Sequence, residues 1–236
     1  MRWLFTKYIP IGQKVHQYEV LDCVGEGRFG ICYIVRYNGQ KYIYKDFKNR
    51  ERKKSKEKLH FEAEILQKLN SSYFPSLFHV VHEKKKYGLL MEYMEGCTIE
   101  AWLFGHKHIF TKDERNKIFL QLLECVSILH HQGIVHRDIR PSNVLYHEGK
   151  IALIDFGLAR WMNTERYVPQ VDFSYLGHFL LYLYYSALPV AQLKKKPWYE
   201  ELPLLEKEKN FFKRLLGLAP EFLCIEEIQE VYRNIM

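Results

Sequence analysis

The chain has 236 residues, of which 47% are hydrophobic and 27% are charged. These values predict a folded globular protein with one large domain or two small lobes, and exclude disordered, collagen-like and disulfide-stapled chains. Lys and Arg number 35 against 28 Asp and Glu, and the resulting charge of +7 suits an anionic ligand. The densest basic block, residues 50–58, has no interleaved aromatic residue, so we expect a solvated helix start and no nucleic-acid binding.

Cysteine usage and hydropathy indicate a cytoplasmic protein. The five cysteines form no CxxC pair, and their odd number does not suggest a disulfide framework. Residues 1–14 lack the apolar core of a signal peptide, and no apolar run is long enough to span a membrane. The best candidate, residues 179–191, is short and contains Pro189, which favours a buried core helix. The eleven histidines show no metal-ligand spacing.

In chain order, the first ninety residues are predicted to form strands with one helix, and the remainder to be mostly helical. Asn38-Gly39 is a strong hairpin signal between two strands. A boundary between two regions is expected near Glu95. The predicted elements are strands at 18–24, 31–36, 41–47, 77–82, 87–91, 144–146 and 151–154, and helices at 55–69 and 111–131.

Gly25, Gly27 and Gly30 form a GxGxxG pattern, which by itself is a weak signal. The residues that follow are β-branched and aromatic, so they favour a strand where a dinucleotide-binding fingerprint needs a helix. Ile31-Cys32 also stands where a Walker loop needs Lys followed by Ser or Thr. What remains is a glycine-rich hairpin whose backbone amides can approach phosphates closely.

Lys45 lies on the third predicted strand, next to the glycine-rich hairpin. On the following helix Glu62 shares a stripe with Leu59, Leu66 and Leu69, which places a carboxylate toward the core. A buried carboxylate needs a cation, and Lys45 is the natural partner. We expect this pair to direct the lysine toward a nucleotide; the alternative is a strand lysine exposed to solvent.

A run of polar residues lies between the long helix and a short predicted hairpin. Asn143 precedes the first strand of this hairpin and Asp155 follows the second, so both side chains should meet at its open end. Such oxygen ligands suit Mg²⁺ when substrate phosphates complete the coordination shell. Asp138 should lie close by as an unligated carboxylate that accepts a proton from an attacking hydroxyl.

Together, these motifs resemble those of the eukaryotic-type protein kinase fold, in the same order and over nearly the whole chain. The matching elements are the glycine-rich loop, the strand lysine Lys45, the helix glutamate Glu62, the catalytic loop with Asp138 and Asn143, and Asp155-Phe156-Gly157. The resemblance implies an α+β, two-lobed fold. Its N-terminal lobe, residues 1–95, would hold an antiparallel sheet plus one helix, and residues 96–236 would be mainly helical.

The resemblance also implies the ligands and further site residues. ATP would bind in the cleft with Mg²⁺ or Mn²⁺, Glu92 and Met94 would lie in the adenine-binding hinge, and Thr98 would lie near the ribose. Arg140 stands where Ser/Thr kinases usually have lysine, so the charge is retained with a different geometry. Residues 172–177 resemble the start of the central helix of the large lobe.

The chain departs from the family after Asp155. Only sixteen residues separate Asp155 from Asp172, and they contain no Ala-Pro-Glu. The compact form resembles small bacterial Ser/Thr kinases and atypical kinases of the RIO type. A protein hydroxyl on Ser or Thr is the favoured acceptor, and Pro141 follows the Ser/Thr style. A small-molecule or sugar kinase, and a non-catalytic nucleotide-binding scaffold, remain as alternatives.

The short segment also bears on regulation through Arg137, which precedes the catalytic aspartate. In kinases with such an arginine, the cation commonly binds a phosphate on the activation segment. Residues 158–171 offer only two hydroxyls, Thr164 and Tyr167, while Glu165 supplies a built-in carboxylate. We therefore expect Glu165 to neutralise Arg137 and activity to be independent of phosphorylation; the alternative is that Thr164 is the switch.

Overall fold

The computed structural model describes residues 8–48, 56–83, 86–188 and 196–235. The chain divides into two compact units, Met1–Met94 and Glu95–Met236. Part of the basic block at 50–58 lies outside the described residues, and so does the side chain of Leu59.

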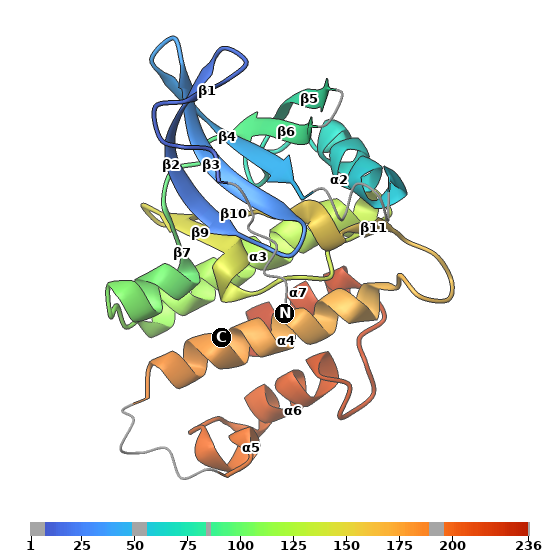
Figure 1. Cartoon of the computed structure of the whole chain (residues 1–236). Coiled ribbons are helices and arrows are strands. Elements are labelled where there is room, and N and C mark those ends of the chain that lie inside the picture. The colour runs from blue at the N-terminus through green and yellow to red at the C-terminus, as the bar shows by residue number, and fades with distance from the viewer. Residues whose placement is uncertain (1–7, 49–55, 84–85, 189–195, 236) are drawn as a thin grey trace, which may run out of the picture. The chain divides into compact units, whose positions relative to one another are not determined.

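The first unit contains a six-stranded antiparallel sheet with the strand order β1-β2-β3-β4-β6-β5. Figure 1 shows this sheet as a curled layer in blue and green. Every strand predicted for this half of the chain is present, each with slightly wider bounds. The strands are β1 (Lys14–Val15), β2 (Tyr18–Glu26), β3 (Gly30–Tyr37), β4 (Gln40–Phe47), β5 (Leu77–Glu83) and β6 (Lys86–Glu92).

The predicted Asn38-Gly39 turn joins β3 to β4. Asn38 and Gly39 have φ angles of 47° and 79°, so both residues adopt the left-handed conformation of a two-residue hairpin turn. Tyr37 pairs with Gln40, and the register continues from there to Gly30 opposite Phe47. The tight turn therefore fixes which side chains of β4 face each side of the sheet.

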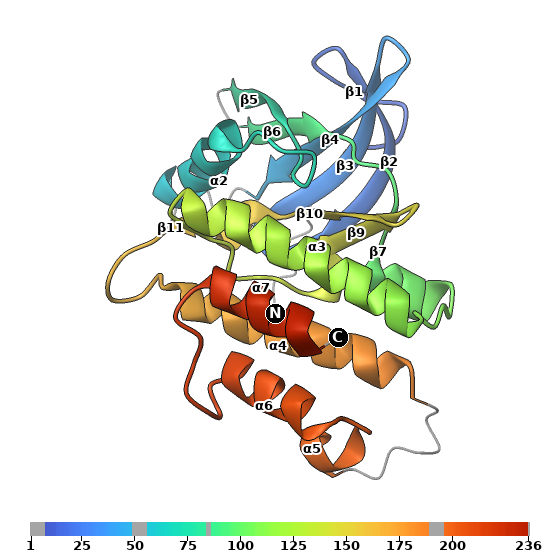
Figure 2. The same cartoon turned by 180° about the vertical axis from the view of Figure 1, so that it is seen from behind.

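The two faces of the sheet carry different residues. Tyr33, Val35 and Tyr44 belong to one buried cluster, against which Ile9 of the N-terminal segment packs. Because side chains alternate along a strand, Lys45 faces the opposite side from Tyr44. Helix α2 (Lys56–Lys68) supplies the partner of Lys45 and lies beside β5, as Figures 1 and 2 show.

The glycine-rich hairpin is tighter than the sequence suggests. The turn was expected over Gly25 to Gly30, but β2 continues to Glu26 and β3 begins at Gly30. Gly25 pairs with Cys32 and Glu26 with Ile31 after a register shift near Cys23, so antiparallel pairing persists into the glycine pattern. A backbone bond from Gly27 N to Gly30 O, 2.9 Å long, closes the remaining turn.

The second unit is mainly helical, with short strands near its polar loops. The helical segments are η1 (Ala101–Gly105), α3 (Lys112–His131), η2 (Pro141–Asn143), η3 (Phe156–Leu158), α4 (Pro169–Ser186), α5 (Trp198–Glu201), α6 (Glu206–Leu215) and α7 (Ile225–Ile235). The strands are β7 (Cys97–Thr98), β8 (Ile134–Val135), β9 (Val144–His147), β10 (Lys150–Leu153) and β11 (Arg160–Trp161).

Helix α3 is the long amphipathic helix predicted at 111–131. Thr111 and Glu114 form a capping box, in which each side chain accepts a hydrogen bond from the other residue's backbone N–H. One face of the helix contacts β10, and other contacts reach α4 and α7, an arrangement visible in Figure 2. Phe119 of α3 packs on Phe211 and Tyr232, which ties α6 and α7 to the same core.

The apolar run predicted as a buried helix at 179–191 belongs to α4. This helix begins earlier than that prediction, at Pro169, because proline suits the first turn of a helix. It ends at Ser186, and residues 189–191 lie outside the described part of the chain. Among the described residues, no helix combines the length and apolar character needed to cross a membrane.

Candidate active site

Lys45 and Glu62 form the ion pair predicted for the first unit. Lys45 Nζ donates to Glu62 Oε1 at 2.7 Å, and the two residues are only 5% and 2% exposed. Such burial favours two charged groups only when they face each other. The Nζ atom also lies 5.6 Å from the centroid of the Phe47 ring, on the same strand. Strand β4 and helix α2 thus hold the lysine in one direction.

The three glycines of the hairpin differ in their surroundings. A Cβ atom added to Gly30 would lie 2.5 Å from the backbone oxygen of Asp46, so only glycine fits the close approach of β3 to β4. A Cβ atom on Gly25 would meet nothing within 4 Å, and on Gly27 only the Gly30 oxygen at 3.9 Å. Gly30 is therefore required by packing, while Gly25 and Gly27 leave open space beside the backbone.

In the second unit, Asp138, Arg140 and Asn143 lie together on the loop after β8. The amide of Asn143 donates to Asp138 Oδ2 at 2.8 Å and to the Asp138 backbone oxygen at 2.9 Å. Arg140 Nε lies 3.3 Å from Asp138 Oδ1, and the Arg140 side chain is 58% exposed. The carboxylate of Asp138 is thus oriented from two sides and remains partly accessible.

Asn143 and Asp155 flank the β9–β10 hairpin as predicted. Val144 pairs with Leu153, and Ile154 N donates to Asn143 O at 2.9 Å, so the two ends of the hairpin are adjacent. Asp155 has a φ of 62°, and its Oδ1 accepts from Gly157 N at 3.3 Å. Within the described residues, no three His, Cys, Asp or Glu side chains gather as a metal site.

Asp172 organises the loop that contains Asp138, a role that was not predicted from the sequence. This carboxylate is 0% exposed and accepts from the backbone N–H groups of His136 and Arg137 at 2.9 and 2.7 Å. His130 Nε2 is 3.0 Å from its Oδ2. A single carboxylate among the apolar residues of helix α4 is the same kind of signal that identified Glu62. It could have predicted that Asp172 is buried and bound to several hydrogen-bond donors.

His136 links the catalytic loop to the Asp155-Phe156-Gly157 motif. Its imidazole is fully buried, and its ring centroid lies 4.8 Å from that of Phe156 in an edge-on arrangement. Burial lowers the pKa of the imidazole, and the nearby carboxylate of Asp172 opposes this effect. The neutral ring therefore acts as a packing element of the core.

The predicted hinge residues are distributed over both units. Glu92 ends β6 in the first unit, where its Oε2 accepts from the backbone N–H and the hydroxyl of Ser76 at 3.1 and 2.9 Å. Met94 is the last residue of that unit. Thr98 lies on β7 of the second unit, and its hydroxyl accepts from Ala101 N at 3.0 Å.

The expectation that Glu165 neutralises Arg137 is wrong. The guanidinium of Arg137 donates to the Leu158 carbonyl at 3.1 Å and lies 4.7 Å from the centroid of the Tyr167 ring. Glu165 is exposed, and its backbone N–H donates to Asn163 Oδ1. The Leu158 carbonyl and the Tyr167 ring are thus the partners of the Arg137 guanidinium, in place of the Glu165 carboxylate.

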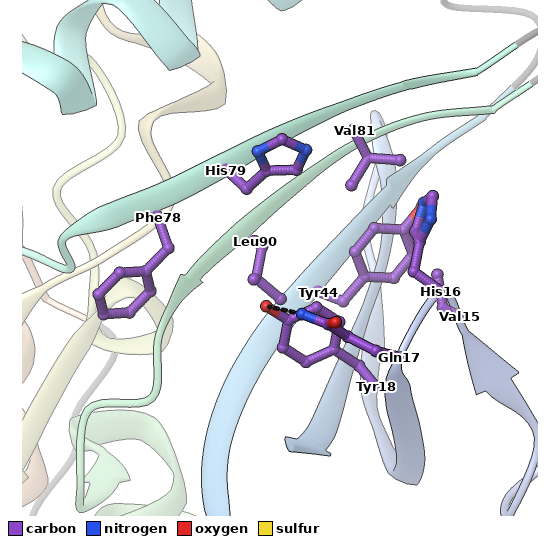
Figure 3. A pocket seen from close by; sticks show the side chains of 9 residues that line it. All are labelled: Val15, His16, Gln17, Tyr18, Tyr44, Phe78, His79, Val81 and Leu90. Carbon is purple, nitrogen blue, oxygen red and sulfur yellow. Dashed lines mark hydrogen bonds between the residues drawn. The ribbon is translucent and has the colours of Figure 1, made fainter. Parts of the chain in front are cut away.

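A pocket of about 430 Å³ opens in the first unit, but it is separate from these residues. It lies on the Tyr44 face of the sheet, with His16, Gln17 and Phe78 among its lining residues, as Figure 3 shows. None of the predicted site residues lines it. We assign the candidate site by the arrangement of charged groups, because this pocket contains none of them.

Comparison with known proteins agrees with the fold. The protein kinase domain family model matches residues 18–187. The chain is 34% identical over 224 residues to a Bacillus subtilis protein named probable serine/threonine-protein kinase YbdM, covering 91% of this chain and 88% of that protein. It is 31% identical to calcium/calmodulin-dependent protein kinase type 1 of Caenorhabditis briggsae and 35% identical to sperm motility kinase 1 of Mus musculus.

Those two matches cover 64% and 62% of this chain, but only 44% and 31% of the animal proteins. The antiparallel sheet with its lysine–glutamate pair and the helical unit with its catalytic loop define a protein with the two-lobed kinase fold. The chain belongs to the protein kinase family, and by that membership it is an ATP-dependent kinase.

Proposed function

We propose that this protein is a serine/threonine protein kinase that transfers the γ-phosphate of ATP to a hydroxyl group of a protein. The observation that carries the proposal is the orientation of the Asp138 carboxylate between the Asn143 amide and Arg140. The name of the Bacillus subtilis relative supports the Ser/Thr class. Pro141, three residues after Asp138, agrees with the Ser/Thr style.

In the first unit, Lys45 would bind the phosphates of ATP, and Glu62 would orient the lysine through the buried ion pair. The open space beside Gly25 and Gly27 supports a role for their backbone amides at the phosphates. Gly30 would keep the hairpin close to β4. The backbone at Glu92 and Met94 would contact adenine, and Thr98 would contact the ribose.

In the second unit, Asp138 would accept the proton of the acceptor hydroxyl, and Arg140 would neutralise charge on the transferred phosphate. Asn143 and Asp155 would hold Mg²⁺ or Mn²⁺. The Nδ2 atom of Asn143 donates to two oxygens of Asp138, which leaves the Asn143 Oδ1 atom as the acceptor that can serve as a ligand. Asp155 adds a hard carboxylate oxygen. The metal, when bound, supplies charge neutralisation at the phosphates.

The identity of the phosphate acceptor is the most specific part of this proposal. A small-molecule or sugar acceptor is the alternative, because residues 156–171 are too few for a long peptide-docking segment. A cytoplasmic setting is likewise a proposal. It rests on the thiols of Cys23, Cys97, Cys125 and Cys224, which are free.

Incubation of the purified chain with γ-³²P-ATP and Mg²⁺ tests the function directly. Casein and the chain itself serve as protein acceptors, and a panel of sugars serves as small-molecule acceptors. Label on Ser or Thr after acid hydrolysis is expected, together with complete loss of transfer in excess EDTA. Label on a sugar alone would replace the protein-kinase proposal, and ATP binding without any transfer would favour a non-catalytic scaffold.

A further inference from the structure

Arg137 connects the catalytic loop to the segment that follows Asp155. Its backbone has a φ of 66°, a left-handed conformation that costs a non-glycine residue energy, and its N–H donates to Asp172. Its side chain reaches away from Asp172 to the Leu158 carbonyl and to the face of Tyr167. The residue directly before Asp138 is thus held at its backbone by one element and at its side chain by another.

The segment around Tyr167 is closed on itself by Asn163. Oδ1 of Asn163 accepts from three successive backbone N–H groups, those of Glu165, Arg166 and Tyr167, at 3.2, 2.8 and 3.0 Å. Asn163 N donates to Tyr167 O at 3.1 Å. Such a turn restricts the backbone at Tyr167 and so fixes where its ring is presented.

The start of the same segment is anchored to the strand that leads into the catalytic loop. Arg160 pairs with Val135 and Trp161 with Ile134, and Met162 N donates to Gly133 O at 2.7 Å. These backbone bonds fix residues 160–162, while the contact between Arg137 and Tyr167 fixes the part that lies further along the chain. Both ends of the segment are therefore tied to the catalytic loop or to the strand before it.

We propose that Tyr167 is a positioning residue that acts through Arg137, holding the catalytic loop and segment 158–167 in their working arrangement without phosphorylation. This inference rests on the proposed kinase function. A cation 4.7 Å from an aromatic centroid lies within the range of an attractive cation–π contact. The ring thereby supplies the partner for the guanidinium that a phosphate would otherwise supply.

The exposed position of Thr164 agrees with this assignment. Its side chain lies on the exposed part of the Asn163 turn, whose hydrogen bonds run from the backbone N–H groups of residues 165–167 to Asn163 Oδ1. The turn is complete through Asn163 alone. Phosphate on Thr164 is therefore not required to order the segment.

Three variants separate the ring from the hydroxyl and from general surface effects. Tyr167→Leu removes the ring, and Tyr167→Phe keeps it. Tyr199→Leu is the matched control, because Tyr199 also lies under a cation, Lys213, at 5.6 Å, but on α5 and α6 away from the catalytic loop. Steady-state kcat and the KM for ATP are measured with Mg²⁺ and casein, before and after phosphatase treatment.

Tyr167→Leu should lower kcat by about five- to tenfold, the size of one partly buried cation–π contact, and leave the KM for ATP unchanged. Tyr167→Phe and Tyr199→Leu should match the parent, and phosphatase should change none of them. A parent-like kcat in Tyr167→Leu, or an equal loss in Tyr167→Phe, would overturn the role of the ring. A tenfold loss on phosphatase treatment and in Thr164→Ala would show that a phosphate is required instead.

A readout that does not need activity distinguishes this inference from the proposed function. The backbone N–H groups of Glu165 and Arg166 donate to Asn163 Oδ1, so their hydrogen-exchange rates report how firmly the turn is held. Exchange should be several-fold faster in Tyr167→Leu than in the parent or in Tyr167→Phe. Equal rates in all three would overturn the inference, whereas an inactive parent that shows the expected exchange pattern would contradict only the kinase function.

Discussion

Each unit of the molecule contains one buried carboxylate at its functional residues, and the two have different partners. Glu62 in the first unit faces the side-chain cation of Lys45. Asp172 in the second unit faces two backbone N–H groups and an imidazole. The first carboxylate therefore orients a flexible charged side chain, while the second fixes the path of the main chain.

This difference indicates which property a substitution would disturb in each unit. A long lysine on a strand has many rotamers, and a single ion pair selects among them. In the second unit, Arg137 on the loop before Asp138 and Asp155 after β10 both have a positive φ, and such conformations must be imposed by their surroundings. Substitutions should therefore disturb charge placement in the first unit and loop conformation in the second.

The largest expected effect is on turnover, in Asp138→Asn. Because this change removes the proposed proton acceptor but keeps the size of the side chain, kcat should fall by about 10²- to 10⁴-fold. Thermal unfolding should stay close to that of the parent. Asp113→Asn, on the exposed first turn of α3, is the control. Parent-like turnover in Asp138→Asn would remove this residue from the mechanism.

The next largest effect is on stability, in Asp172→Asn. The new amide offers N–H where the loop needs an acceptor, so one buried backbone N–H loses its partner at a cost of about 1–3 kcal/mol. Urea unfolding measures this loss. Unchanged stability would show that Asp172 does not fix the loop and would contradict the contrast between the units.

Glu62→Gln should act mainly on catalysis. Lys45 loses a charge-assisted hydrogen bond worth about 1.5–3 kcal/mol, so kcat/KM should fall by roughly tenfold or somewhat more. Its control is Glu19→Gln, which breaks the ion pair between Glu19 and Arg36. This pair is 3.0 Å long, and its Arg36 and Glu19 side chains are 48% and 39% exposed, so kcat/KM should change little. Equal kcat/KM in the two variants would mean that the buried pair does not orient the lysine.

The smallest expected effect is a pH dependence from His136. Burial holds the pKa of the His136 imidazole in the folded state below its usual value of 6.5, so the unfolded chain takes up a proton first as the pH falls. Stability contributed by the neutral ring is complete above about pH 6.5 and is lost progressively below it. Urea unfolding at pH 7 and pH 5.5 should show a smaller acid loss in His136→Phe than in the parent, with the exposed His178→Gln as control.

Much of the fold could be predicted from local patterns. Asn38-Gly39 predicts a tight hairpin, which the structure contains. The apolar spacing around Glu62 predicts a carboxylate that faces the core, with Lys45 as its natural partner, and this pair forms. The Thr111 to Glu114 spacing marks the start of α3 through a bond over three residues. Interactions between residues a few positions apart depend on the local sequence, so a sequence pattern can predict them.

Only the tertiary structure decided the contacts around the catalytic loop. Asp172 binds backbone groups 36 and 35 residues earlier, and Arg137 reaches a carbonyl 21 residues later. No local pattern chooses between Glu165 and Tyr167 as the partner of Arg137, because the choice depends on how the Asn163 turn aims each side chain. The sequence by itself determined which chemical groups the protein carries and their order, and long-range packing determined which of them meet.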